Sequence, residues 1–159
     1  MSNYKIDDFD RRLLEVLQEN NLIPAERIAE RVGLSVSAVQ RRARRLRKEQ
    51  VIVADVSVVE PKAVGRGAAF IVEVTLERES REIVEAFKAR IRVAPEVQQC
   101  FYVTGDADFV LFVTARDIAD YESIIERLFN DRGIRKFKTA VVLSTVKTSL
   151  LVPIGEERR

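Results

Sequence analysis

The sequence predicts an α+β fold with two domains, an N-terminal winged helix-turn-helix followed by a ferredoxin-like βαββαβ domain. Apolar residues recur at helical spacing in three stretches of the first 50 residues, and a glycine joins the second stretch to the third. From residue 68 onward, segments with apolar residues at every second position, typical of strands, alternate with segments that have apolar residues at helical spacing. A length of 159 residues suffices for two small domains. We expect the first domain at residues 1–54, a linker strand at 55–66 and the second domain at 67–159.

The first two helices are expected over residues 8–20 and from Pro24 to Gly33. The first helix has one apolar face, formed by Phe9, Leu13, Val16 and Leu17. Asp7 or Asp8 supplies its N-cap. Pro24 suits the start of the second helix, where its missing N–H is not needed. Gly33 permits the left-handed backbone that ends that helix.

The spacing of Ala29, Gly33 and Val39 indicates a helix-turn-helix. A small residue in the second helix lets the third helix cross closely, and the glycine permits the tight turn between them. Ser35 caps the third helix, whose apolar positions are Val36, Val39, Ala43 and Leu46. In such a unit the second of the two helices enters the major groove of DNA.

The remaining face of the third helix is basic. No acidic residue occurs between Ser35 and Lys48, whereas a solvated helix usually mixes both signs. Phosphate would offset the repulsion among the cations, so we predict double-stranded DNA as a partner. The candidate DNA-binding residues are Ser35, Ser37, Ala38, Gln40, Arg41, Arg42, Arg44, Arg45 and Lys48. Of these, we expect Ser37, Ala38, Gln40 and Arg41 to contact bases, and the later arginines to contact phosphate. A solvated cation run near a helix C-terminus stays the alternative for Arg47 and Lys48.

The valine-rich stretch at 51–59 favours a short wing and a strand leading out of the first domain. This strand either belongs to a linker or pairs with its copy in a partner chain, and both alternatives stay open. In the second domain we expect strands at 68–77, 97–104, 108–115 and 138–146, with residues 150–154 as a candidate extension of the sheet. Helices are expected between Ser80 and Pro95 and over residues 117–130.

This order places both helices on one face of the sheet, and the other face should be polar if it meets water. The residues of strand 109–113 are instead apolar on both faces, as are residues 141–143. An apolar second face implies a second cover, most simply another copy of the same sheet. We therefore predict a homodimer through the second domain, which would present two recognition helices to a two-fold DNA site.

The composition limits the chemistry that the chain can perform. It contains 0 histidines and 1 cysteine, which excludes Ser–His and Cys–His couples, zinc sites that need histidine, and an internal disulfide. Carboxylate-bound Mg²⁺ and an enzyme that uses Lys or Asp stay open on composition alone. Our prediction is no metal, no cofactor and no catalytic residue. No apolar run reaches the roughly 20 residues that cross a bilayer, and the N-terminus lacks a signal-peptide pattern, so we expect a cytoplasmic protein that does not contact a membrane.

Motifs in both predicted domains resemble those of one protein family. They are Ile6–Leu14 in the first helix, Arg31-Val32-Gly33-Leu34-Ser35 followed by Arg41-Arg42 and Leu46, Tyr102–Asp108, and the closing Thr145-Val146-Lys147 with Pro153. In this order they resemble the Lrp/AsnC family, the leucine-responsive or feast/famine transcriptional regulators. The resemblance implies a winged helix-turn-helix joined to a ferredoxin-like effector domain, often called RAM. It also implies homodimers that assemble into tetramers or octamers.

The resemblance further implies a site for an amino acid or related small metabolite. The family's Gly-Asp-x-Asp turn carries over to Gly105, Asp106 and Asp108, and the implied site also takes in Tyr102, Thr139 and Ala140. Glycine leaves N–H groups open to a carboxylate, while an aspartate can hold an ammonium. A tight hairpin turn favours Gly and Asp regardless of any ligand, so this alternative stays open.

The function predicted from the sequence is a sequence-specific DNA-binding transcriptional regulator modulated by such an effector. One alternative is an effector-binding module whose DNA-binding domain has lost its role. Another is an enzyme, since siroheme decarboxylases resemble this two-domain architecture. That resemblance implies histidines, which are absent from this sequence.

Overall fold

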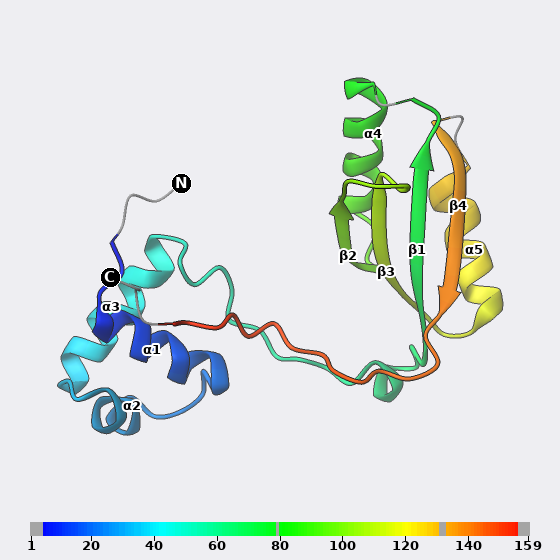
Figure 1. The fold of residues 1–159 in the computed structure, drawn as a ribbon. Coiled ribbons are helices and arrows are strands. Elements are labelled where there is room, and N and C mark those ends of the chain that lie inside the picture. Colours follow the sequence, from blue (N-terminus) through cyan, green and yellow to red (C-terminus); the bar gives the residue numbers. More distant parts are fainter. Residues whose placement is uncertain (1–4, 79, 131–132, 156–159) are drawn as a thin grey trace. The chain divides into compact units, whose positions relative to one another are not determined.

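The computed structural model describes residues 5–78, 80–130 and 133–155, and they form two compact units (Figure 1). The helical unit comprises the residues up to Ser57 together with those from Lys147 onward, and the sheet unit comprises Val58–Val146. The ends of the two predicted domains, 1–4 and 156–159, lie outside the described residues. No helix within the described ranges has the length and apolar character needed to span a membrane.

The helical unit contains α1 (Asp8–Glu19), α2 (Ala25–Val32) and α3 (Val36–Lys48). Asp7 caps α1 in a capping box, and Ser35 caps α3. Gly33 has φ 76°, so it supplies the left-handed turn between α2 and α3 that the sequence predicts. The three helices bury one core, made of Leu13, Leu14, Val16, Ile28, Ala29, Val32, Val39, Ala43 and Leu46.

The C-terminal segment, residues 147–155, groups with the helical unit in the single chain. It was expected in the second domain, with residues 150–154 extending the sheet, but the structure assigns it to the helical unit. The Gln18 side chain explains this, because it donates to the Val152 carbonyl (3.0 Å) and accepts from the Val152 N–H (2.7 Å). Ile154 packs against the helical core.

The predicted wing and strand at 51–59 do not form in the single chain. Residues 51–60 are all described, and none of them lies in a strand. Val53, Val56, Val58 and Val59 are exposed. A valine-rich segment favours extended backbone, but a strand also needs a neighbouring strand that accepts and donates its hydrogen bonds.

The sheet unit contains β1 (Ala68–Leu76), α4 (Arg81–Arg92), β2 (Val97–Tyr102), β3 (Phe109–Ala115), α5 (Ile118–Phe129) and β4 (Ile134–Val141). The strands are antiparallel in the order β2-β3-β1-β4, which is the predicted ferredoxin-like arrangement (Figure 1). The fourth strand was expected at 138–146, and it begins and ends earlier than that. Its partner explains this, since β1 pairs with it from Ile134 through Val141.

Both helices cover the same face of the sheet, as predicted. Phe87 of α4 contacts Phe109 of β3, and Tyr121 of α5 stacks on Phe70 of β1 with ring centroids 3.8 Å apart. The opposite, open face has an apolar centre that includes Ile71 and Phe112 and a charged end formed by Glu73, Lys136 and Lys138, positions that follow from the strand register. The open face is therefore only partly apolar, which is less than the sequence predicts.

Candidate nucleic-acid interface and effector site

The exposed stripe of α3 consists of Ser37, Gln40, Arg41, Arg44 and Lys48. Ser37, Arg41, Arg44 and Lys48 are spaced three or four apart, and Gln40 adjoins Arg41. The stripe lies opposite the buried residues Val39, Ala43 and Leu46. Ser35 begins the helix, since its hydroxyl accepts the Ala38 N–H at 3.2 Å, and Ala38 itself is half-buried. Among the described carboxylates, none pairs with Arg41, Arg44 or Lys48. These three cations are therefore available to an anion outside the chain.

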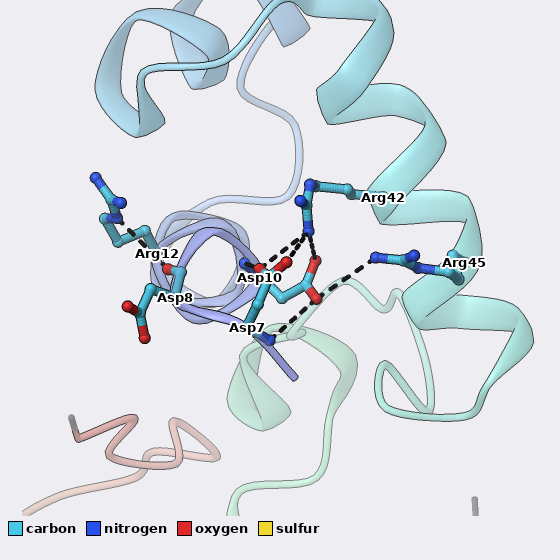
Figure 2. A network of polar contacts seen from close by, with 6 residues as sticks. All are labelled: Asp7, Asp8, Asp10, Arg12, Arg42 and Arg45. Atoms are coloured by element: carbon cyan, nitrogen blue, oxygen red, sulfur yellow. Dashed lines mark hydrogen bonds and ion pairs between the residues drawn. The ribbon is translucent and has the colours of Figure 1, made fainter. Parts of the chain in front are cut away.

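Arg42 points the other way, toward α1 (Figure 2). Its Nη1 lies 2.8 Å from Asp10 Oδ1 and 2.8 Å and 3.0 Å from the two carboxylate oxygens of Asp7. Hydrogen bonds to Asp10 and then Asp7 raise the pKa of Arg42. Partial burial disfavours the charged form of Asp7, but hydrogen bonds from the Asp10 N–H and from Arg42 outweigh it and lower the pKa of Asp7. The structure thus gives Arg42 two protein carboxylates as partners, and a phosphate contact by Arg42 stays a prediction.

Two other arginines of α3 also have partners within the helical unit. Arg45 Nη2 lies 3.6 Å from Asp10 Oδ2, and its side chain remains 45% exposed. Arg47 contacts Asp55 through two hydrogen bonds of 2.7 Å and 3.0 Å, and the hydrogen bond to Asp55 raises the pKa of Arg47. For Arg47 this ion pair replaces the solvated alternative. Arg45 stays at the edge of the exposed stripe and can still reach a ligand.

The sequence patterns predicted no role for Asp10, although a signal for it exists. Asp10 stands between Phe9 and Leu13 on the side of α1 that faces the core, and it is fully buried. An acidic residue on an apolar helix face needs a cation, because a buried unpaired charge is strongly disfavoured. The basic helix α3 supplies that cation.

The predicted effector turn is a tight connection between β2 and β3. Gly105 has φ 121°, a backbone conformation that favours glycine. The Asp108 carboxylate accepts the Leu76 N–H at 2.7 Å, while the Asp108 N–H donates to the Val74 carbonyl. Asp108 therefore holds the turn against β1, whereas the neighbouring Asp106 is exposed.

A polar cavity of about 310 Å³ lies beside Asp106. Glu73 and Thr75 of β1 line it together with Asp106 and the segment 135–138 of β4, which includes three cations. Thr75 donates to the Asp106 carbonyl at 3.4 Å, which joins the turn to the cavity wall. Carboxylates and cations on one small cavity match the two charges of an amino-acid zwitterion.

The other predicted effector residues lie apart from this cavity. Tyr102 lines a separate groove of about 350 Å³ between α4 and β2, with Lys88 Nζ 5.1 Å from its ring centroid. Thr139 shares a hydrogen bond with the Tyr121 hydroxyl on the face that the helices cover. Ala140 pairs with Ile71 on the open face. A single chain therefore does not bring the six predicted effector residues together.

Cys100 lines the same groove as Tyr102, and burial raises the pKa of its thiol. Throughout the described ranges, no group of three Cys, Asp or Glu residues is placed to hold a metal ion.

Two family models together match most of the chain. The AsnC-type helix-turn-helix domain matches residues 6–47, and the Lrp/AsnC ligand binding domain matches residues 69–152. An HTH-type transcriptional regulator of Sinorhizobium fredii is 50% identical over 151 residues, covering 94% of this chain and 89% of that protein. The leucine-responsive regulatory protein of Haemophilus influenzae is 33% identical over 152 residues, covering 94% of this chain and 92% of that protein.

Solved structures agree with this match. A transcriptional regulator from Neisseria meningitidis in complex with L-methionine has a TM-score of 0.86 and 28% identity, covering 94% of this chain and 97% of that chain. A feast or famine regulatory protein from Mycobacterium tuberculosis complexed with L-methionine has a TM-score of 0.86 and 29% identity, covering 95% of this chain and 100% of that chain.

Proposed function

Because this chain belongs to the Lrp/AsnC family of transcriptional regulators, we propose that it acts by placing α3 in the major groove of its operator DNA. The observation that carries this proposal is the exposed stripe, a helix face without an acid whose three cations pair with no carboxylate among the described residues. Near its N-terminus, Gln40 and Arg41 can form paired hydrogen bonds with adenine and guanine. Arg44 and Lys48, further along, contact phosphate and set the register.

We propose that the protein works as a homodimer, built through the open face of the sheet. Ile71 and Phe112 give that face an apolar centre, which a second copy of the sheet would remove from water. The charged end, with Glu73 and Lys138, offers opposite charges to the partner. Two copies of α3 then meet a two-fold site on DNA. Assembly of dimers into tetramers or octamers belongs to the same proposal.

We propose that an amino acid or related metabolite modulates DNA binding. The polar cavity beside Asp106 supports this, together with the L-methionine bound by two similar solved structures. Asp106 faces the ammonium group, and Lys136 and Lys138 face the carboxylate. Asp108 accepts the Leu76 N–H through Oδ2, which supports the turn. A carboxylate has a second oxygen that can still accept a hydrogen bond from the ligand.

The proposed activity is transcriptional regulation and not catalysis. We propose that the protein acts in the cytoplasm, where its DNA target lies. The enzyme alternative implies histidines, and the sequence contains 0. No cofactor or metal enters the proposal.

The first experiment is a titration of the protein onto DNA from upstream of its own gene and onto scrambled DNA of equal length, at one near-physiological salt concentration. We expect a preference of roughly a hundredfold or more for the specific site. Arg41→Ala should lower the specific affinity by about 1–3 kcal/mol and affect scrambled DNA less. Equal losses on both DNAs would reassign Arg41 to phosphate, and failure of the wild type to bind either DNA would contradict the proposed function.

The effector proposal has its own test, which is calorimetric titration of the protein with single amino acids, starting with L-methionine. Asp106→Asn should weaken the binding of any amino acid that the wild type binds, while the variant keeps the same DNA affinity without ligand. Unchanged ligand binding by Asp106→Asn would remove the polar cavity from the effector site.

A further inference from the structure

The Asp10 carboxylate joins α1 to α3 from a fully buried position (Figure 2). Its Oδ1 accepts Arg42 Nη1 at 2.8 Å, and its Oδ2 lies 3.6 Å from Arg45 Nη2. Asp7, the N-cap of α1, contacts the same Arg42 nitrogen. We call these four residues, Asp7, Asp10, Arg42 and Arg45, the acid–arginine network.

The place of the two arginines on α3 gives this network a geometric consequence. Arg42 directly follows Arg41, and Arg45 directly follows Arg44, so each arginine of the network adjoins a cation of the exposed stripe. Neighbouring residues of an α-helix point about 100° apart, because a turn takes 3.6 residues. Holding Arg42 against α1 therefore fixes the direction in which Arg41 points. Rotating α3 about its axis would break the contacts of Arg42 and turn the exposed stripe away from its direction.

The burial of Asp10 makes this constraint stiff. A buried carboxylate that loses its cation is strongly disfavoured, so the pair resists separation. The Arg42 side chain is only 18% exposed, and its guanidinium also lies 5.5 Å from the centroid of the Phe9 ring. Arg45 is different, because it is 3.6 Å from Asp10 and 45% exposed. Its contact with Asp10 is therefore weaker than that of Arg42.

We propose that Asp10 is a positioning residue for DNA recognition, which acts through Arg42 to fix the rotation of α3 and through Arg45 to restrain a cation at the edge of the exposed stripe. This inference rests on the proposed function of α3. The inference goes beyond that function because it assigns a role in sequence specificity to a buried residue that cannot contact DNA. It also separates two roles among the arginines of α3: Arg41 and Arg44 meet the nucleic acid, while Arg42 sets their direction.

The test compares Asp10→Asn with the wild type on operator and on scrambled DNA. Asparagine has nearly the same shape and keeps one acceptor oxygen, but it carries no charge. Asp7 is then the only carboxylate of the network left to Arg42, and the ion pair between Arg45 and residue 10 is lost. We expect the ratio of specific to non-specific affinity to fall about tenfold or more, the scale of one lost paired base contact. Affinity for scrambled DNA should stay the same, because the cations of the exposed stripe are unchanged, and the salt dependence should not become weaker.

Arg44→Ala is the matched control, since it removes a cation of the exposed stripe and leaves the network intact. It should lower both affinities by the same factor and weaken the salt dependence. Asp7→Asn is the second variant, in case Asp10→Asn does not fold. Asparagine caps helices as well as aspartate does, so Asp7→Asn removes charge from the network and keeps α1. We expect a smaller fall of the ratio in the same direction. Thermal unfolding of each variant, followed by circular dichroism, shows whether the helical unit is intact at the assay temperature.

The outcomes are distinguishable. A folded Asp10→Asn or Asp7→Asn variant with the wild-type ratio would overturn the positioning role. Equal losses on both DNAs, accompanied by a lower melting temperature, would also overturn it, because they would show a purely structural ion pair. A wild type that does not prefer its operator would instead overturn the proposed function, and the inference with it.

Discussion

Replacing Arg44 with alanine tests whether the exposed stripe contacts phosphate. Its guanidinium is exposed on α3, and none of the described carboxylates pairs with it. A cation that neutralises one phosphate contributes about −0.9 to the slope of log K against log salt. Arg44 and Lys48 together should therefore contribute about −1.8 to this slope for each protomer, and Arg44→Ala should reduce their contribution to about −0.9.

The size of the effect follows from the slopes. Between 50 and 200 mM salt, a contribution of −1.8 lowers affinity about 12-fold, whereas −0.9 lowers it about 3.5-fold. The assay is fluorescence anisotropy with labelled operator DNA and scrambled DNA at four or more salt concentrations. Because phosphate contacts carry no sequence information, Arg44→Ala should lower both affinities by the same factor.

Arg47→Ala is the control for this prediction. Arg47 lies on the same helix, but it contacts Asp55 through two hydrogen bonds. Its removal should leave the salt slope unchanged. An unchanged slope for Arg44→Ala, or an equal change for both variants, would refute the division of α3 into free and paired cations.

Three further predictions concern the stability of the two units. Asp108→Ala leaves the Leu76 N–H without its acceptor and should lower the free energy of unfolding by about 1–3 kcal/mol in urea denaturation; an unchanged midpoint would contradict the structural role of Asp108. The hydrogen bond from Arg116 lowers the pKa of Asp120 to about 2, below its value of about 3.9 in unfolded chains. The stability that this carboxylate contributes is therefore present above about pH 4 and is lost as pH falls toward 2, so Asp120→Asn should flatten the acid limb of a circular-dichroism titration. Gln18→Ala should expose the C-terminal segment to faster amide hydrogen exchange, and unchanged protection would show that other contacts hold it.

The helices could be predicted closely because their signals are local. Ser35 and Ser80 each accept a backbone N–H three residues ahead, as a cap does. Gly33 ends α2 with a positive φ. The buried positions repeat with the helical period, and they place the core without reference to distant residues.

The edges of the sheet unit could not be predicted in the same way. The apolar run at 141–143 favoured a strand at 138–146, whereas β4 is the charged segment Ile134–Val141. An edge strand is defined by the strand it pairs with, and β1 accepts the earlier register from Leu76 to Phe70. The C-terminal segment shows the same limit, because its partner Gln18 lies 134 residues away.

The candidate DNA interface also has a part that local sequence predicts and a part that depends on contacts between distant residues. The sequence identified α3 and its basic face, and the structure keeps Arg41 and Arg44 exposed there. The sequence did not predict that Arg42 contacts α1, because the net charge of a helix does not show which of its cations already have carboxylate partners. Asp10 supplies the missing information, since an acid on the apolar face of one helix requires a cation from the helix packed against it. On α3, a count of arginines therefore includes cations that already have carboxylate partners, as Arg42 has in Asp10 and Arg47 has in Asp55.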